Sequence, residues 1–133
     1  MAKETGLGWT TCSVDNAAAA LQDVKNDITN LEFSTPYALQ EVTGLDKSAM
    51  ERLSLLADLT GTLNSVFNPA ANRIHAVMSG DLRVVRTVSL TISAKSLSGE
   101  VLFSDYALTR AATGEFTASH PYSLADGTTP TWT

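Results

Sequence analysis

Residues 42–67 read VTGLDKSAMERLSLLADLTGTLNSVF, and the second half of this stretch decides the fold. From Asp58 onward, polar residues alternate with apolar or small ones, so that Leu59, Leu63 and Phe67 fall on one face of an extended chain. Alternation with a period of two is typical of a strand with one buried face. The first half is long and charged, and we expect it to form a loop that leads into this strand.

Similar alternation on both sides of this stretch predicts further strands. One helix is expected between them, because Asn68 is a favourable N-cap, Pro69 suits a first helical turn and Gly80 follows the apolar stripe. One helix among many short strands indicates a mainly β domain, an antiparallel β-sandwich or barrel-like fold with one flanking α-helix. The expected strands are residues 9–14, 28–35, 58–67, 84–93, 101–110 and 115–122, with a short extended piece near 22–24.

Length and charge limit the possible functions. The chain has 133 residues, which is enough for one domain over residues 1–133 and too few for two. The net charge of −5 disfavours tight binding of nucleic acid, since such binding needs basic residues to replace counterions along the phosphates. The first residues contain no apolar signal core and no apolar run approaches a membrane span, so we expect a cytoplasmic product without a membrane partner.

Three segments of the domain depart from the strand pattern. Residues 1–7 are a polar N-terminal arm, and residues 125–133 are a C-terminal tail in which Trp132 indicates an anchor. Residues 37–57 form a long loop, within which residues 46–53 could make about two helical turns. The loop has too many leucines to stay exposed, so we expect another surface to cover it.

No motif for chemistry is present in the sequence. The single Cys12 is expected to be a small buried hydrophobe, and His75 is expected at the surface without a partner at metal-ligand spacing. Asp23 and Asp27 are more typical of a solvated loop than of a metal site. We therefore predict that the protein is not an enzyme and has no catalytic, cofactor-binding or metal-binding residues.

The order and spacing of several segments resemble a known family. Residues 28–33, 42–58 and 63–68, followed by 86–92, 100–106 and 113–119, are similar to the major tail tube proteins of long-tailed, siphovirus-like bacteriophages. The type VI secretion tube protein is similar in fold. The resemblance covers most of the chain from Trp9. It implies a structural virion protein that forms homohexameric rings, which stack into the hollow tail tube through which genomic DNA is delivered.

The resemblance also implies partners and a location. The lumen would hold the tape measure protein and DNA, and the tube ends would meet tail terminator and baseplate or distal tail proteins. The protein would be assembled in the host cytoplasm and reside in the virion tail. Two alternatives remain open: another virion tail component of related fold, such as a tail terminator or head–tail joining protein, or a carbohydrate-binding β-sandwich.

Two surfaces are expected to carry this role. If strand 28–35 with strand 58–67, and strand 101–110 with strand 115–122, form one sheet, its apolar face packs on the core and its polar face lines the lumen. The core-facing side chains would be Leu31, Phe33, Leu59, Leu63, Tyr106, Leu108, Phe116 and Ala118. The lumen-lining side chains would be Asn30, Glu32, Ser34, Thr60, Thr62, Asn64, Asp105, Thr109, Glu115, Thr117 and Ser119. The inter-ring contacts would be Asp46, Lys47, Glu51, Arg52, Leu53, Leu55 and Leu56.

Overall fold

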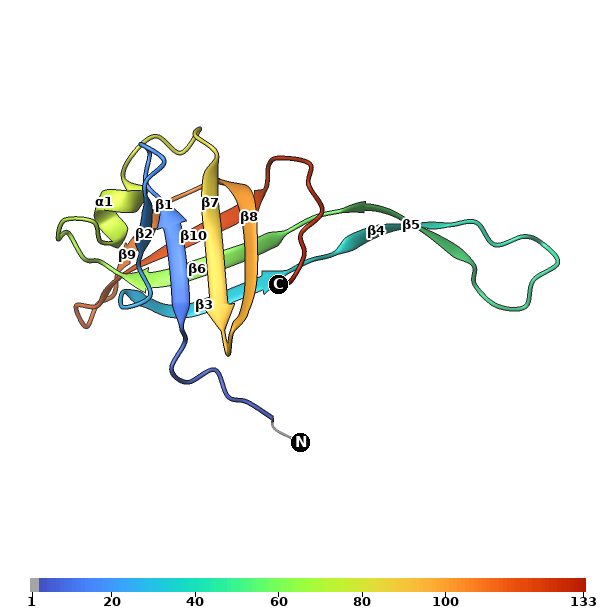
Figure 1. Cartoon of the computed structure of the whole chain (residues 1–133), viewed down its shortest axis with the longest axis horizontal. Helices are drawn as coiled ribbons and strands as arrows, with labels where there is room; N and C mark the ends of the chain where they lie inside the picture. The colour runs from blue at the N-terminus through green and yellow to red at the C-terminus, as the bar shows by residue number, and fades with distance from the viewer. Residues whose placement is uncertain (1–2) are drawn as a thin grey trace.

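The computed structural model describes residues 3–133 and confirms the expected class: it is mainly β, with antiparallel sheets and one short helix (Figure 1). No helix in this range is long and apolar enough to cross a membrane. The elements are β1 (Thr11–Asp15), β2 (Leu21–Asp23), β3 (Ile28–Ser34), β4 (Tyr37–Glu41), β5 (Arg52–Ala57), β6 (Thr60–Val66), α1 (Ile74–Met78), β7 (Arg86–Ile92), β8 (Lys95–Phe103), β9 (Ala107–Arg110) and β10 (Phe116–Leu124).

One sheet folds over itself to make two layers. Its strand order is β2-β1-β7-β8-β10-β6-β3, and β9 pairs with the start of β10. The long strand β10 joins the layers, because residues 116–119 pair with β9 whereas residues 122–124 pair with β8. In Figure 1, β1, β7 and β8 lie in front, and β3, β6 and β10 run across them behind.

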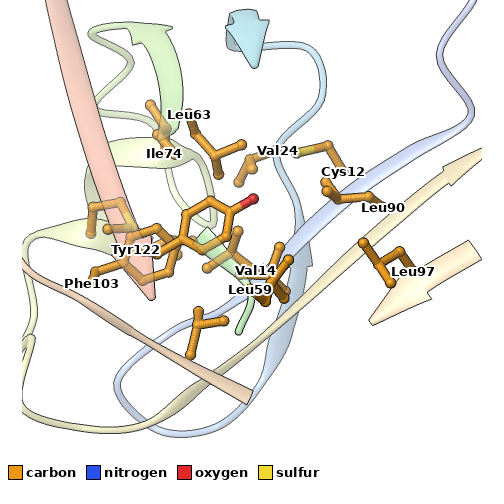
Figure 2. Packing of buried hydrophobic residues seen from close by; sticks show 14 residues of the cluster. Cys12, Val14, Val24, Leu59, Leu63, Ile74, Leu90, Leu97, Phe103 and Tyr122 are labelled. Atoms are coloured by element: carbon orange, nitrogen blue, oxygen red, sulfur yellow. The ribbon is translucent and has the colours of Figure 1, made fainter. Parts of the chain in front are cut away.

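The hydrophobic core lies between these layers. Val14 and Leu97 come from the front layer and Leu63 from the back layer, and all three are buried (Figure 2). The rings of Phe103 and Tyr122 lie with their centroids 5.4 Å apart. The Tyr122 hydroxyl lies against Gly61, where a Cβ would come within 2.5 Å of it, so this position of β6 needs a glycine.

The helix is shorter than the predicted segment from Pro69 to Gly80. Asn72 has a φ of 61°, which interrupts any helix that begins at Pro69. The Asp27 carboxylate instead accepts the N–H of Ile74 at 3.2 Å and the amide of Asn68 at 2.8 Å. The start of α1 is therefore held by a buried acid 47 residues away in the chain.

The end of α1 is held by a second buried charge. Arg86 on β7 is fully buried and donates to the carbonyl oxygens of Val77 and Asp81 at 2.5 and 2.9 Å. Helix carbonyls in the last turn lack intrahelical partners, and a cation suits that end of the helix dipole. Asp27 and Arg86 together fix α1 over one end of the sandwich.

The strand expected at 101–110 is wrong in detail, since the structure changes both its start and its extent. Ser93 and Ala94 both have positive φ, 50° and 62°, and make a two-residue turn, so β8 already starts at Lys95. Such turns match the twist of hairpin strands. The segment expected to be one strand at 101–110 is divided between two strands. β8 ends at Phe103, and the chain crosses to the back layer before β9 begins.

Residues 37–57 form a β-hairpin instead of a loop with helical turns, and we call this hairpin the arm. Strands β4 and β5 pair from Tyr37–Ala57 to Glu41–Arg52. The N–H of Asp58 donates to the carbonyl of Pro36 at 2.8 Å, so the arm continues the β3–β6 ladder outward. Figure 1 shows the arm projecting far from the two layers, on the side opposite α1.

The C-terminal tail, in which Trp132 was expected to act as an anchor, packs on its own subunit. The backbones of Thr133 and Ser96 exchange hydrogen bonds of 2.9 and 3.0 Å, and the Trp132 ring lies 5.9 Å from that of Phe33. The tail thereby covers the free edge of the first half of β8. In the N-terminal segment 1–7, residues 3–7 are exposed and Glu4 accepts a hydrogen bond from Ser93. Residues 1 and 2 lie outside the described range.

Candidate assembly surfaces

The back layer unites the two predicted strand pairs in one sheet, in the order β3-β6-β10-β9. Residues directly opposite each other in antiparallel strands share a face. Asn64 pairs with Asn30 and Ser119, and Thr62 pairs with Glu32 and Pro121. These rows form a continuous polar surface on the side of the layer away from the core.

We call this surface the polar face. Nine of the eleven residues predicted to line a lumen lie on it in the sheet register. The other two, Asp105 and Glu115, are exposed but lie outside the strands, in the connections before β9 and before β10. The nine strand residues are Asn30, Glu32, Ser34, Thr60, Thr62, Asn64, Thr109, Thr117 and Ser119.

Hydroxyl and amide groups dominate the polar face. The hydroxyls of Ser34 and Thr60 lie 3.2 Å apart across the strands, and Thr109 pairs with Thr117 in register. Glu32 is the one charged residue among the nine, and the flanking Asp105 and Glu115 add two further acids. The eleven predicted positions therefore carry three negative charges and no positive charge.

The opposite face packs on the core only in part. Leu59, Leu63 and Ala118 are buried as predicted, and Leu31, Phe33 and Tyr106 are half-buried against the core. The predicted burial of Leu108 and Phe116 is wrong for the single chain, since they are 42% and 39% exposed. Both lie where the layer ends: β9 is an edge strand with one partner, and Phe116 is the first residue of β10.

The arm concentrates apolar surface. Sixteen large hydrophobic side chains are exposed among the described residues, and half of them belong to this one hairpin. Leu56 is 85% exposed, and a bulge places it with Leu55 opposite Ala38. Contiguous exposed apolar surface of this kind marks interaction sites. The eight side chains are Tyr37, Leu39, Val42, Leu45, Met50, Leu53, Leu55 and Leu56.

All seven residues predicted to make inter-ring contacts lie on the arm and are exposed. The tip is closed by hydrogen bonds of 2.8 Å from the N–H of Val42 to the carbonyl of Glu51 and from the N–H of Glu51 to the hydroxyl of Thr43. Asp46 and Lys47 form a loose ion pair of 4.0 Å. Glu51 and Arg52 have no ion-pair partner within residues 3–133, so both remain available to another chain.

A buried polar pair on β6 and β10 escaped the sequence analysis. Ser65 Oγ and His120 Nε2 lie 2.7 Å apart, and both residues are fully buried. The ring of His120 stacks on Tyr106, and burial lowers the pKa of His120 to about 4. Its Nδ1 has no hydrogen-bond partner among the described residues. The inward phase of residues 116, 118 and 122 also predicts an inward position 120, which is the signal that could have found it.

The pair has the spacing of a nucleophile and its base, but its surroundings give it a packing role. No solvent reaches either side chain, so no substrate could reach the Ser65 hydroxyl. The network continues outward through Tyr106, whose hydroxyl lies 3.0 Å from His75 Nδ1. His75 is thus half-buried in this network, and its expected surface position is wrong. Asp27, considered above with Asp23, holds the helix, while Asp23 pairs with Lys25 at 3.4 Å.

Two comparisons by sequence find no match, neither a family model nor a curated protein. The fold does have solved counterparts. A chain in the virion of a native gene transfer agent particle aligns with a TM-score of 0.71 and 12% identity, covering 98% of this chain and 99% of that one. A chain in the tail of an empty gene transfer agent particle, determined by helical refinement with C6 symmetry, aligns with a TM-score of 0.71, 14% identity and the same coverage. At these identities the likeness establishes that the chain shares the fold of these two particle proteins over nearly its whole length.

Proposed function

We propose that the protein is the tube-forming structural subunit of a phage-like tail, and specifically a major tail tube protein of the long-tailed type. The observation that most supports this proposal is the fold, which 98% of the chain shares with a component of a tail that has C6 symmetry. The role is structural and not enzymatic. The whole chain acts as one tail tube domain in the virion tail, to which the arm contributes the inter-ring contact.

The sheet edges support ring formation. In the back layer, β3 pairs only with β6 and β9 pairs only with β10, so each has an outer edge without a partner among residues 3–133. Free edges pair readily with other chains. Joining the β9 edge of one subunit to the β3 edge of the next extends the layer around a ring. Six subunits then close a barrel that leaves no edge, with every polar face turned inward.

The composition of the polar face suits a conduit. Duplex DNA carries about one negative charge per 1.7 Å of axis, and each basic contact would add affinity by releasing counterions. A wall of hydroxyls and amides with Glu32, Asp105 and Glu115 offers no such contact. The lumen would therefore hold DNA or a tape measure protein without binding either tightly.

The arm supplies the contact between rings. Burying a leucine side chain contributes roughly 1.5–3 kcal/mol, whereas an exposed ion pair contributes about 0–1 kcal/mol. The apolar residues Leu53, Leu55 and Leu56 should therefore provide most of the stacking energy. The charged pairs at the tip would set register and orientation. Tail terminator and baseplate or distal tail proteins would cover the arms or their acceptors at the two tube ends.

Electron microscopy of the concentrated, purified protein tests this function. We expect hollow filaments with sixfold symmetry. A variant in which residues 38–56 are replaced by Asn-Gly joins the paired residues Tyr37 and Ala57 by a two-residue turn. This variant should keep the circular dichroism of the intact fold and form monomers or single rings. Normal filaments from it would refute the role of the arm, and discrete rings without filaments from the unaltered protein would favour a tail terminator.

A further inference from the structure

A second apolar cluster lies at the end of the molecule that carries α1. Leu108 and Phe116 are 42% and 39% exposed, and the ring of the half-buried Phe67 lies 4.9 Å from that of Phe116. We call these three residues the far-end patch. The sheet register brings Leu108 and Phe116 together, because Leu108 pairs with Ala118 and Phe116 lies two residues before Ala118 on the same face of the sheet. Outside the arm, the far-end patch joins two of the eight other exposed large hydrophobic side chains among the described residues.

The far-end patch and the arm lie at opposite ends of one ladder. Strand β6 begins at Thr60, two residues beyond the Asp58 bond to the arm, and ends at Val66. Seven residues of strand span about 20 Å. Figure 1 shows the arm on one side of the layers and the ends of β6 and β9, beside α1, on the other. Complementary surfaces at opposite ends of a subunit make head-to-tail contacts that repeat without limit unless a ring closes them.

We propose that the far-end patch is the acceptor for the arm of a second copy of this chain in the adjacent ring. The inference rests on the proposed tube function and adds the partner surface that the arm needs. Each subunit then offers one donor and one acceptor of matching apolar character. Within the tube both surfaces are covered. The arms stay exposed only at one end of the tube, and the far-end patches only at the other.

The chain's own termini do not cover the patch. The C-terminal tail is bonded to Ser96 on β8, and Glu4 near the N-terminus is bonded to Ser93 in the β7–β8 turn. Within the described chain the patch is therefore free for another subunit.

Charge at the rim favours the same pairing. Arg110 lies opposite Phe116 in the sheet, is exposed, and has no ion-pair partner within the described residues. The arm holds three acids, two of them Glu41 and Glu51, against two bases, so its net charge is −1. An acid of the incoming arm can therefore meet Arg110 at the edge of the patch.

Disulfide trapping tests the contact in assembled protein. The single native cysteine, Cys12, is fully buried, so an introduced cysteine is the accessible thiol. A Leu53→Cys variant is mixed with Phe116→Cys, assembled and oxidised. The matched control replaces Phe116→Cys by Leu102→Cys, which changes an equally exposed apolar residue, 39% in both cases, on another strand. We expect several-fold more disulfide-linked dimer from the patch mixture than from the control.

The outcomes separate this inference from the proposed function. If filaments form and the control mixture gives as much disulfide-linked dimer as the patch mixture, the inference is overturned and the tube function still stands. An absence of filaments from the unmodified protein would overturn both. If the cysteine variants fail to assemble, hydrogen exchange on the unmodified filaments decides: residues 67 and 108–116 should gain protection on assembly. Unchanged exchange at these residues would refute the acceptor.

Discussion

The two-layered body and the arm are stabilised by different contacts, although both belong to one ladder of paired strands. In the body, β6 has a strand on both sides and a core beneath it, and Leu63 is completely buried. In the arm, β4 and β5 have only each other, and Leu56 is 85% exposed. A two-stranded hairpin alone is marginally stable in water. The body therefore carries the stability of the subunit, and the arm depends on what it contacts.

The largest expected difference between the two regions is the cost of removing a leucine. Leu63→Ala leaves a cavity in the core and should lower the free energy of unfolding by about 2–5 kcal/mol. Leu56→Ala removes the same atoms from an exposed site and should change it by less than about 0.5 kcal/mol. Urea unfolding of unassembled protein measures both. Equal losses from the two variants would mean that the arm folds against the body.

When assembly is measured instead of unfolding, Leu56→Ala should have the larger effect of the two variants. Leu56→Ala should raise the protein concentration needed for filaments, because the leucine is buried only between subunits. A Leu63→Ala variant that still folds should assemble near the normal concentration. Sedimentation of filaments over a dilution series gives this concentration for each variant. An unchanged value for Leu56→Ala would show that this leucine does not contribute to stacking.

The buried pair in the body should make its stability depend on pH. Burial lowers the pKa of His120 to about 4 from the ordinary histidine value of 6.5. Between these values the unfolded chain binds the proton more readily, so stability is full above pH 6.5 and falls as the pH drops toward 4. A shift of this size corresponds to about 3 kcal/mol. Urea unfolding at pH 7 and pH 4.5 should show the loss.

A His120→Gln variant provides the control for this prediction. Glutamine can still bond to Ser65, but it does not titrate, so the variant should lose less stability than the wild type over the same pH interval. His75 and the carboxylates remain in both proteins, and the difference therefore isolates His120. An identical loss in both proteins would show that His120 is not the responsible group.

A smaller effect is expected where the body holds α1. Asp27→Asn keeps the shape of the side chain but removes the charge that accepts hydrogen bonds from Ile74 and Asn68. Replacing a helix cap typically costs about 0.5–2 kcal/mol, and we expect a loss in this range. Thermal or urea unfolding measures it. Asp23→Asn, which alters an exposed ion pair, is the matched control and should have almost no effect.

The sequence predicted those parts of the fold that local burial imposes. Alternation located β3, β6 and β10 and placed nine polar residues on one face, because a half-buried strand must alternate. The arm gave no such signal: Leu53, Leu55 and Leu56 follow no clean alternation, since no core in the single chain requires one. The extent of α1 also depended on a distant residue, Asp27, which no local pattern reveals. Similarly, the contact of Trp132 with Phe33 joins an aperiodic tail to a strand far away in the chain.

Substitutions on the polar face should change the stability of the isolated subunit least. Their effect should instead be on how the tube binds DNA. Replacing Glu32, Asp105 and Glu115 together with lysine alters only exposed side chains, so the fold and the filaments should persist. In a tube the lysines would face the lumen. They would neutralise phosphates and release counterions, which adds affinity that falls with salt by about 0.9 log units per contact for each tenfold rise in concentration. DNA delivery by particles carrying the variant should slow or stall.

A variant with the same change of charge elsewhere makes this test specific. Replacing Glu4, Asp23 and Asp126 with lysine also raises the net charge by six, from −5 to +1, but on exposed sites outside the polar face. Filaments of both variants are incubated with short duplex DNA, sedimented and washed at rising salt. If the polar face lines the channel, its variant should retain DNA that is protected from nuclease, whereas the control should bind DNA that nuclease removes. Nuclease-sensitive DNA on both would place the polar face on the outside of the tube, because only a lumen excludes the enzyme.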